Sequence, residues 1–157
     1  MTSEEFRQVC SRFATGVAVL AVTDASGAPH GLTVNSFTSV SADPPLVLVC
    51  IDNSCALLPL FESASHFGLS FLAVGQQDVS TRFAFVPERR FDGVLWMPTP
   101  NRVPVIEGVL GWMECRIDQR IHAGDHRILI GQVLRSHCEP GGEPLVYYGS
   151  AYRRLAT

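Results

Sequence analysis

The stretch Gly31-Leu-Thr-Val-Asn-Ser-Phe-Thr-Ser-Val-Ser41 combines the pattern of a β-strand with a high density of polar side chains. Five of its eleven residues carry a hydroxyl group and one carries an amide. A buried polar group without a partner costs about 1 to 3 kcal/mol. The stretch therefore predicts a polar lining for a planar ligand, although a Ser/Thr-rich edge strand bonded to its own turns gives the same pattern.

The segments on either side of this stretch also have the pattern of strands. Residues 17–23 are rich in Val and other apolar residues, and residues 24–30 contain the turn pair Ser26-Gly27, which predicts a hairpin into the polar stretch. Residues 46–52 consist mostly of Val, Leu and Ile. We expect them to form a central strand that is buried on both faces.

Other strands and three helices are expected along the rest of the chain. Strands are predicted at residues 66–73, 108–121, 125–136 and 144–148, with Ala123-Gly124 turning the long hairpin. Helices are predicted at residues 2–15, with a Thr2/Glu5 capping box and a stop at Gly16, at residues 54–63, capped by Ser54, and at residues 76–85, ended by Pro87. Because turns and not helical crossovers join the strands, we expect one domain over residues 1–157, an antiparallel barrel with peripheral helices.

The composition excludes several classes of function. The net charge of −3 in 157 residues disfavours a broad nucleic-acid-binding face. All twelve basic residues are arginines, which excludes Schiff-base chemistry and a Walker-type phosphate loop, since both need lysine. The five cysteines are never spaced Cys-x-x-Cys, so we expect reduced thiols and no metal site.

The sequence also predicts a cytoplasmic protein without membrane or nucleic-acid partners. The longest strongly apolar run, residues 44–51, is about eight residues long, whereas a membrane-spanning helix needs about 20. The start of the chain, Met1-Thr-Ser-Glu-Glu-Phe6, is acidic and lacks the basic and apolar regions of a secretory signal.

Motifs in a defined order along nearly the whole chain match a known family. The first are Thr33-Val-Asn-Ser-Phe-Thr-Ser-Val-Ser41, Asp43-Pro-Pro-Leu-Val and Cys50-Ile-Asp-Asn-Ser54. The later ones are Gln77-Asp-Val-Ser-Thr-Arg-Phe-Ala84, Arg90-Phe91, Glu114-Cys115, Gly124-Asp-His126, Ile130-Gly-Gln-Val133 and Pro144-Leu-Val-Tyr-Tyr148 before Tyr152. By this set the chain resembles the flavin reductase-like, FMN-binding split-barrel family, which includes the reductase components of two-component flavin-dependent monooxygenases.

The resemblance implies a mostly β fold, an antiparallel Greek-key split barrel with peripheral helices. It also implies a homodimer that binds flavin, as FMN or FAD, in a groove near the subunit interface. Two segments are expected to follow the isoalloxazine ring and ribityl chain: Thr33, Val34, Asn35, Ser36, Phe37, Thr38 and Ser39, and then Cys50, Ile51, Asp52 and Ser54. The other expected contacts, mostly at the phosphate end, are Ser80, Phe83, Ala84, Arg89, Arg90, Phe91 and Tyr152.

Two polar groups complete the candidate site. Arg82, Arg89 and Arg90 suit a phosphate, because guanidinium forms charge-assisted bidentate bonds, but the sequence leaves open which of them binds it. The resemblance makes His126 the catalytic-site histidine, implicated in nicotinamide binding, whereas a lone histidine at the start of a strand is more often structural. Asp125 is expected to brace the turn or orient the imidazole.

The resemblance implies an NAD(P)H-dependent flavin reductase, an oxidoreductase that transfers hydride from NADH or NADPH to flavin N5. Since the two rings carry this chemistry, the protein needs to supply position and electrostatics but no nucleophile. The reduced flavin is expected to pass to a transient monooxygenase partner. Two alternatives stay open: an oxidoreductase that retains its flavin and acts on another small molecule, and a non-catalytic flavin- or haem-binding module.

Overall fold

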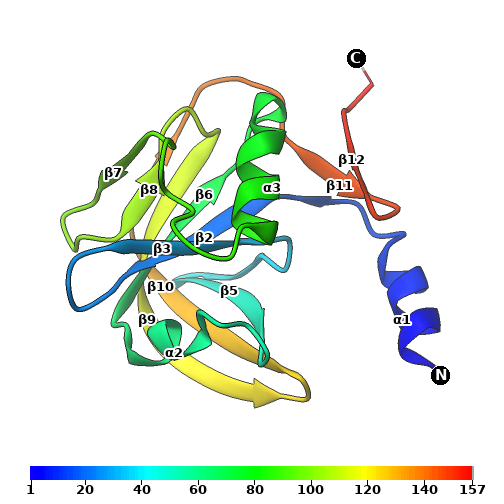
Figure 1. Ribbon diagram of the computed structural model, residues 1–157, viewed down its shortest axis with the longest axis horizontal. Helices are drawn as coiled ribbons and strands as arrows, with labels where there is room; N and C mark the ends of the chain where they lie inside the picture. The colour runs from blue at the N-terminus through cyan, green and yellow to red at the C-terminus, as the bar shows by residue number, and fades with distance from the viewer. Residues whose placement is uncertain (157) are drawn as a thin grey trace.

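The computed structural model describes residues 1–156, and within them seven antiparallel strands form the main sheet (Figure 1). Its strand order is β3 (Pro29–Val34), β2 (Ala18–Thr23), β6 (His66–Phe71), β9 (Gly111–Ala123), β10 (His126–Cys138), β5 (Pro45–Asp52) and β4 (Thr38–Ala42). The prediction of an antiparallel barrel with peripheral helices is confirmed. The long hairpin is also confirmed, because β9 and β10 pair directly and turn at Gly124, which has a φ of 61°.

The sequence predicts that the polar stretch forms one strand, and this prediction is wrong. It divides into β3 and β4, which lie at opposite edges of the sheet and are joined by residues 35–37 alone. An extended chain advances at most about 3.6 Å per residue, so the four steps from Val34 to Thr38 span at most about 14 Å. The sheet must therefore curl until its two edges face each other. We call residues 35–37 the seam, because they cross the split between the barrel edges.

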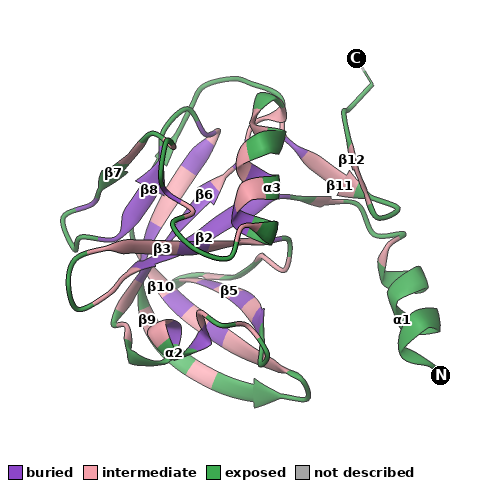
Figure 2. Ribbon diagram, in the orientation of Figure 1, coloured by how far each residue is buried: buried purple, intermediate pink, exposed green. Residues whose placement is uncertain are grey.

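The fully buried strand is β2 and not β5. Residues 18–22 of β2 are buried without interruption, because one face of the strand lines the barrel interior and the other packs under α3 (Gln77–Phe85) (Figure 2). In β5, burial alternates along the strand. Val47, Val49 and Ile51 point into the core, whereas Leu48 and Cys50 are half-buried on the outer face.

The first helix, α1 (Ser3–Cys10), has the predicted capping box. The Glu5 backbone N donates to Thr2 Oγ1 at 3.1 Å, and the Thr2 backbone N donates to Glu5 Oε2 at 2.6 Å. The prediction that this helix continues to residue 15 is wrong. Thr15 and Gly16 instead form β1, which pairs with β11 (Val146–Tyr148). Strand pairing outweighs helix propensity at this point.

The two other helices lie against the barrel. The second, α2 (Leu58–Ser63), begins four residues later than predicted and is not capped by Ser54, whose side chain binds Asp52 instead. The third, α3, follows the short 3₁₀ helix η1 (Val74–Gln76). It runs as predicted and ends at Phe85. It packs across the outside of β2 and β3 (Figure 1).

Three short strands near the site or the rim were not predicted. β12 (Ala151–Arg153) pairs with β11, so that β1, β11 and β12 form a separate small sheet. β7 (Trp96–Pro98) and β8 (Pro104–Ile106) form a hairpin beside β6. The backbone of β8 approaches β6 so closely that a Cβ on Gly68 would lie 2.5 Å from the Pro104 carbonyl oxygen. No helix within residues 1–156 has the length and apolar character that crossing a bilayer requires.

Candidate functional site at the barrel seam

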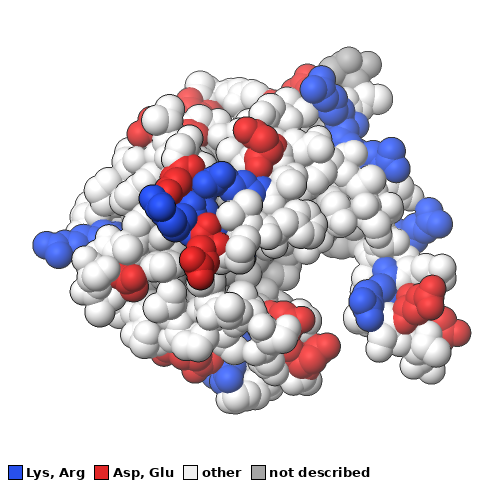
Figure 3. Space-filling model, viewed as in Figure 1, with Lys and Arg blue, Asp and Glu red and all other residues white. Residues whose placement is uncertain are grey.

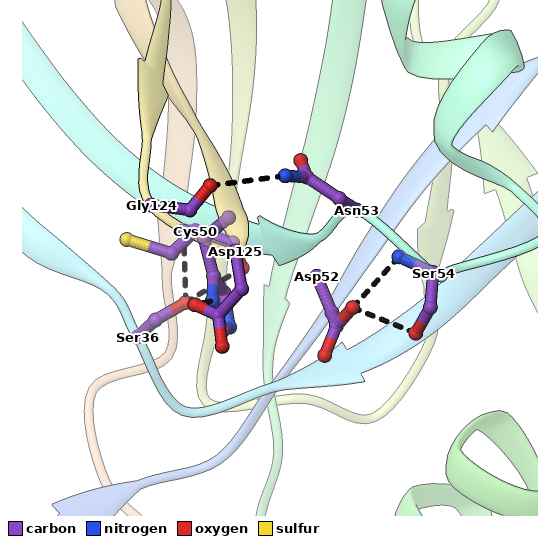
Figure 4. A network of polar contacts seen from close by, with 8 residues as sticks. Ser36, Cys50, Asp52, Asn53, Ser54, Gly124 and Asp125 are labelled. Atoms are coloured by element: carbon purple, nitrogen blue, oxygen red, sulfur yellow. Dashed lines mark hydrogen bonds and ion pairs between the residues drawn. The ribbon is translucent and has the colours of Figure 1, made fainter.

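The seam is anchored to β5 through the side chain of Ser36 (Figure 4). Its hydroxyl donates to the Cys50 carbonyl at 3.1 Å and accepts from the Cys50 backbone N at 2.9 Å. The neighbouring polar side chains of Asn35 and Thr38 are exposed. The backbone is thus held in place while polar groups stay open to solvent, as a binding site for a polar ligand requires.

The turn after β5 is fixed to the tip of the β9–β10 hairpin. The Asn53 backbone N donates to the Asp125 carbonyl at 2.9 Å, and Asn53 Nδ2 donates to the Gly124 carbonyl at 3.3 Å (Figure 4). Hydrogen bonds from the hydroxyl and backbone N of Ser54, both 2.7 Å from Asp52 Oδ1, lower the pKa of Asp52. Asp52 is therefore anionic at neutral pH.

His126 lies at the start of β10, directly across from Asp52. Its Nδ1 is 2.7 Å from Asp125 Oδ1, the orienting contact that the sequence predicts. His126 and Cys50 line a hollow of about 800 Å³ that lies between the barrel and α1. On the α1 side, the lining of this hollow includes Arg7. Burial raises the pKa of the Cys50 thiol, so this residue stays a neutral thiol at neutral pH.

A second pocket, of about 450 Å³, lies along the seam between residues 13–18 and residues 34–38. Thr15 Oγ1 is buried beside it and has no hydrogen-bond partner within residues 1–156. Such a group costs about 1 to 3 kcal/mol when it stays unpaired. The polar side chains of this pocket that are open to a ligand are instead those of Asn35 and Thr38.

The predicted contacts on α3 are linked to both the seam strand and the C-terminal sheet. Thr33 Oγ1 donates to the Ser80 carbonyl at 2.6 Å, and Ser80 Oγ is 2.7 Å from the hydroxyl of Tyr152. These three residues line a pocket of about 180 Å³, which continues from the seam pocket past Asn35. α3 therefore holds its position relative to the seam through polar contacts as well as apolar packing.

The three arginines near the end of α3 differ in their contacts. Arg82 donates to the carbonyls of Arg90 and Arg89 at 2.6 and 3.0 Å, and Arg90 donates to Val86 and, at 2.8 Å, to Gly31. The side chain of Arg89 is 81% exposed and contacts only the exposed Asp92, at 2.7 Å. Figure 3 shows a group of basic and acidic side chains lying close together on the face viewed in Figure 1. Arg89 is thus the arginine whose guanidinium is open to a ligand.

Three of the residues predicted to contact flavin have side chains that point away from any pocket surface. Ile51, Phe83 and Phe91 are 1%, 0% and 5% exposed and belong to the core. Ile51 points inward by the alternation of β5, and Phe83 lies on the inner face of α3. Phe91, in the loop after α3, packs edge to face against Phe83 with ring centroids 4.8 Å apart. Contacts from Ile51 and Phe83 to a ligand can therefore come only from their backbone, and the predicted contacts at the remaining positions stay predictions.

Sequence reasoning missed two aromatic residues at the pocket beside α3. Phe85, the last residue of α3, and Tyr147, on β11, both line it. Phe85 is 78% exposed although it is a large apolar residue. Its position directly after the matched motif Gln77–Ala84 indicated that it could lie near the site. Its exposure could be learned only from the fold.

Comparison with known proteins identifies the family. Residues 10–156 match the family described as the flavin reductase like domain. FMN reductase (NADH) SmoA of Agrobacterium fabrum is 42% identical over 154 residues, which cover 98% of this chain and 87% of that protein. The chain spans only 55% and 44% of the length of two relatives from Rhizobium meliloti.

Solved structures agree with this match. The Streptomyces globisporus NADH:FAD oxidoreductase SgcE6, in complex with NAD and FAD fragments, superimposes with a TM-score of 0.92 at 34% identity, over 98% of this chain and 92% of that one. The styrene monooxygenase flavin reductase SMOB of Pseudomonas putida S12 has a TM-score of 0.89 at 32% identity, over 97% of each chain. In sequence and in fold, the chain belongs to the flavin reductase family.

Proposed function

We propose that the protein is an NAD(P)H-dependent flavin reductase that supplies reduced FMN or FAD to a separate monooxygenase. The observation that carries this proposal is the seam, a solvent-open polar segment that is hydrogen-bonded through Ser36 to Cys50, which lines the same hollow as His126. The match of residues 10–156 to the flavin reductase family supports the same reaction, and so do the NADH-dependent reductases among the relatives of the chain.

The residues at the seam fit a flavin. The pyrimidine edge of isoalloxazine offers carbonyl and N–H groups, and the seam pocket offers the exposed amide of Asn35 and the exposed hydroxyl of Thr38. The apolar body of the ring requires an apolar wall, and half-buried Phe37, edge to face with Phe71, supplies one in the seam pocket. A site of this kind has mostly apolar walls with a few convergent polar groups.

The chain contributes position and charge to the reaction. When bound, the flavin supplies the chemistry by accepting a hydride from the reduced nicotinamide ring. We expect His126, whose Nδ1 is 2.7 Å from Asp125 Oδ1, to contact the nicotinamide nucleotide in the hollow that it lines together with Cys50. In intramolecular model reactions, correct orientation of the reacting groups lowers the barrier by up to about 7 to 11 kcal/mol. A site that holds the two rings against each other draws on the same effect. The site therefore needs no nucleophile.

Exchange of the flavin with a partner is supported by how open the site is. Asn35, Thr38 and Ser39 are exposed, and no segment within residues 1–156 covers them. A flavin bound along this surface can leave without unfolding of a lid. This openness supports release of reduced flavin to a separate oxygenase, and the structurally similar SMOB is the flavin reductase of a styrene monooxygenase.

A homodimer is part of the proposal. On the outer face of the sheet, Cys50 lies across from Ile128, and Leu48 lies across from Ile130. All four side chains are only half-buried, which leaves an apolar face beside the site. α1 stands away from this face with its own apolar residues exposed (Figures 1 and 2). Contiguous apolar surface of this kind marks a protein interface.

The test is anaerobic flavin reduction with the purified protein. NADH and NADPH are each paired with FMN, FAD and riboflavin, and bleaching of the flavin is followed by absorbance. Turnover with an excess of free flavin supports the proposal. Flavin that stays bound through repeated dilution indicates an oxidoreductase that retains its cofactor, and absence of bleaching indicates a binding module. We place the reaction in the cytoplasm, a reducing compartment that suits the free cysteines of the described chain.

A further inference from the structure

Positive charge is concentrated in the two terminal segments of the chain. Residues 6–23 and residues 144–156 together contain four arginines and no acidic residue, and residues 31–42 contain no charged residue at all. The whole chain, in contrast, has a net charge of −3. The charge of the protein is therefore unevenly distributed, and the basic part of it lies in these two segments.

The fold brings the two terminal segments together beside the seam pocket. Arg153 lies two strands away from Gly16, which lines that pocket, because β12 pairs with β11 and β11 pairs with β1. Two strand spacings amount to about 10 Å. The Gly149 backbone N donates to the Ser11 carbonyl at 2.9 Å, so the turn between β11 and β12 lies next to Arg12. Figure 3 shows basic side chains along the edge of the molecule that α1 and the C-terminal residues form.

The arginines at this edge are not neutralised by the protein. Arginines elsewhere are bound to other groups, as Arg135 is to the Glu114 carboxylate at 2.6 Å. The side chains of Arg12, Arg153 and Arg154 are exposed and form no ion pair or hydrogen bond within residues 1–156. Charges of this kind produce a field that extends into the solvent over about one Debye length, which is about 10 Å at 0.1 M salt.

These arginines do not form the wall of a binding pocket. Tyr152 lines the pocket beside α3, and since side chains alternate along a strand, Arg153 points to the opposite face of β12. The lining of the seam pocket begins at Phe13 and does not include Arg12. The three arginines therefore act on a ligand through their field outside the pockets and not through contact inside them.

We propose that Arg12, Arg153 and Arg154 form an electrostatic guide that draws the phosphate-bearing flavin from solution to the seam pocket. A phosphate monoester carries about 1.5 to 2 negative charges at neutral pH, and a chain with a net negative charge would otherwise repel it. Charges at the rim of a site act mainly on association and its salt dependence. This inference rests on the proposed function, because it assumes that flavin binds along the seam.

The test measures association and dissociation rate constants of FMN and of riboflavin, which has no phosphate, by stopped-flow flavin fluorescence. At an ionic strength of about 10 mM, one unit charge about 10 Å from the phosphate changes the association rate constant about threefold. Arg153→Gln should therefore lower this constant for FMN about threefold, and Arg153→Gln combined with Arg154→Gln about tenfold. At about 0.5 M salt, the loss in the double variant should fall below twofold.

Arg102→Gln is the matched control, because it removes the same charge from another exposed arginine. The Arg102 carbonyl accepts a hydrogen bond from Thr23, at the end of β2, whereas Ala18, at the start of β2, lines the seam pocket. The five steps between these two ends span about 17 Å. Arg102→Gln should change the association rate constant of FMN by less than twofold.

A loss that is confined to FMN, is suppressed by salt and leaves the dissociation rate constant within twofold supports the guide. Faster dissociation with unchanged association would show that the arginines contact the bound phosphate, and it would overturn the inference. Equal losses for riboflavin, equal losses in the Arg102 variant, or no loss in the double variant would also overturn it. Failure of the proposed function is separate, because it shows as absence of FMN reduction by the unmodified protein.

Discussion

His126 and Asp52 are paired across two antiparallel strands, at the point where β5 ends and β10 begins. The pairing places an imidazole and a carboxylate on the same face of the sheet, above Cys50. Hydrogen bonds from Ser54, together with the positive field of His126, lower the pKa of Asp52. His126 thus lies among polar groups of the β9–β10 hairpin and of the turn after β5, and hydrogen bonds join these two segments.

Replacing His126 by Ala is expected to impair use of the nicotinamide nucleotide. Because Asp125 orients this imidazole toward the hollow, its loss should raise the KM for NADH about tenfold or more, while the dissociation constant for FMN changes less than twofold. Steady-state kinetics and flavin fluorescence measure the two effects. His122→Ala is the control, since His122 contacts Arg127 on the same hairpin. Equal kinetics for both variants would remove His126 from the site.

Arg89 is expected to bind the flavin phosphate. Arg89→Ala removes the one guanidinium of the group that is not bound to backbone carbonyls, and it should raise the dissociation constant for FMN about tenfold. Binding of riboflavin, which has no phosphate, should not change. Arg90→Ala should instead lower the unfolding temperature. The prediction fails if riboflavin and FMN lose affinity equally.

The apolar face of α1 is expected to be buried in a dimer. Sedimentation velocity should give about twice the chain mass of 17.1 kDa for the unmodified protein. Val9→Asp, at a side chain that is 72% exposed, should shift the equilibrium toward the monomer, because a charge at an apolar interface is costly to bury. Gln8→Asp adds the same charge next to it on the polar face of the helix. A dimer that tolerates both changes equally would show that α1 lies outside the interface.

The buried carboxylate of Glu114 is expected to make stability depend on pH. Burial alone raises its pKa, but hydrogen bonds from Thr99, Asn101 and Arg135 outweigh burial and lower it. A carboxylate with a lowered pKa in the folded state stabilises the fold above its ordinary pKa of about 4.3, and this stabilisation is lost as the pH falls through the lowered value.

Glu114→Gln should therefore lower the free energy of unfolding at pH 7 by about 3 kcal/mol. The difference from the unmodified protein should shrink as the medium is acidified below pH 4, as measured by urea unfolding at a series of pH values. Glu139→Gln is the control, because Glu139 is an exposed partner of His137 and should cost less than about 1 kcal/mol. A difference that is constant with pH would contradict the assignment.

Gly68→Ala tests the close approach between β6 and β8. The added Cβ would meet the Pro104 carbonyl oxygen at 2.5 Å, so the backbone must shift, at a cost of about 1 to 3 kcal/mol. Urea unfolding measures the loss. At Gly75 a Cβ meets no described atom within 4 Å, and Gly75→Ala should change stability by less than about 0.5 kcal/mol. Similar losses in both variants would indicate that backbone freedom, and not the contact, is responsible.

Local patterns predicted much of the fold. The Thr2/Glu5 capping box, α3 and the β9–β10 hairpin are where the sequence places them, because each depends on residues that are close together along the chain. Predictions failed where a distant segment competed. Thr15 pairs with β11 instead of extending α1, and the polar stretch divides because its two halves pair with different strands.

The sequence by itself determined the chemistry: an arginine-only, acidic chain with a hydroxyl-rich stretch and a Gly-Asp-His turn, in the order that the flavin reductase family uses. Only the tertiary structure decided which of those groups face a ligand. Curling of the sheet brings the seam beside Cys50, and strand register sets His126 across from Asp52. Backbone carbonyls bind the side chains of Arg82 and Arg90, whereas the side chain of Arg89 pairs only with the exposed Asp92. These relationships join residues far apart along the chain, so no local pattern encodes them.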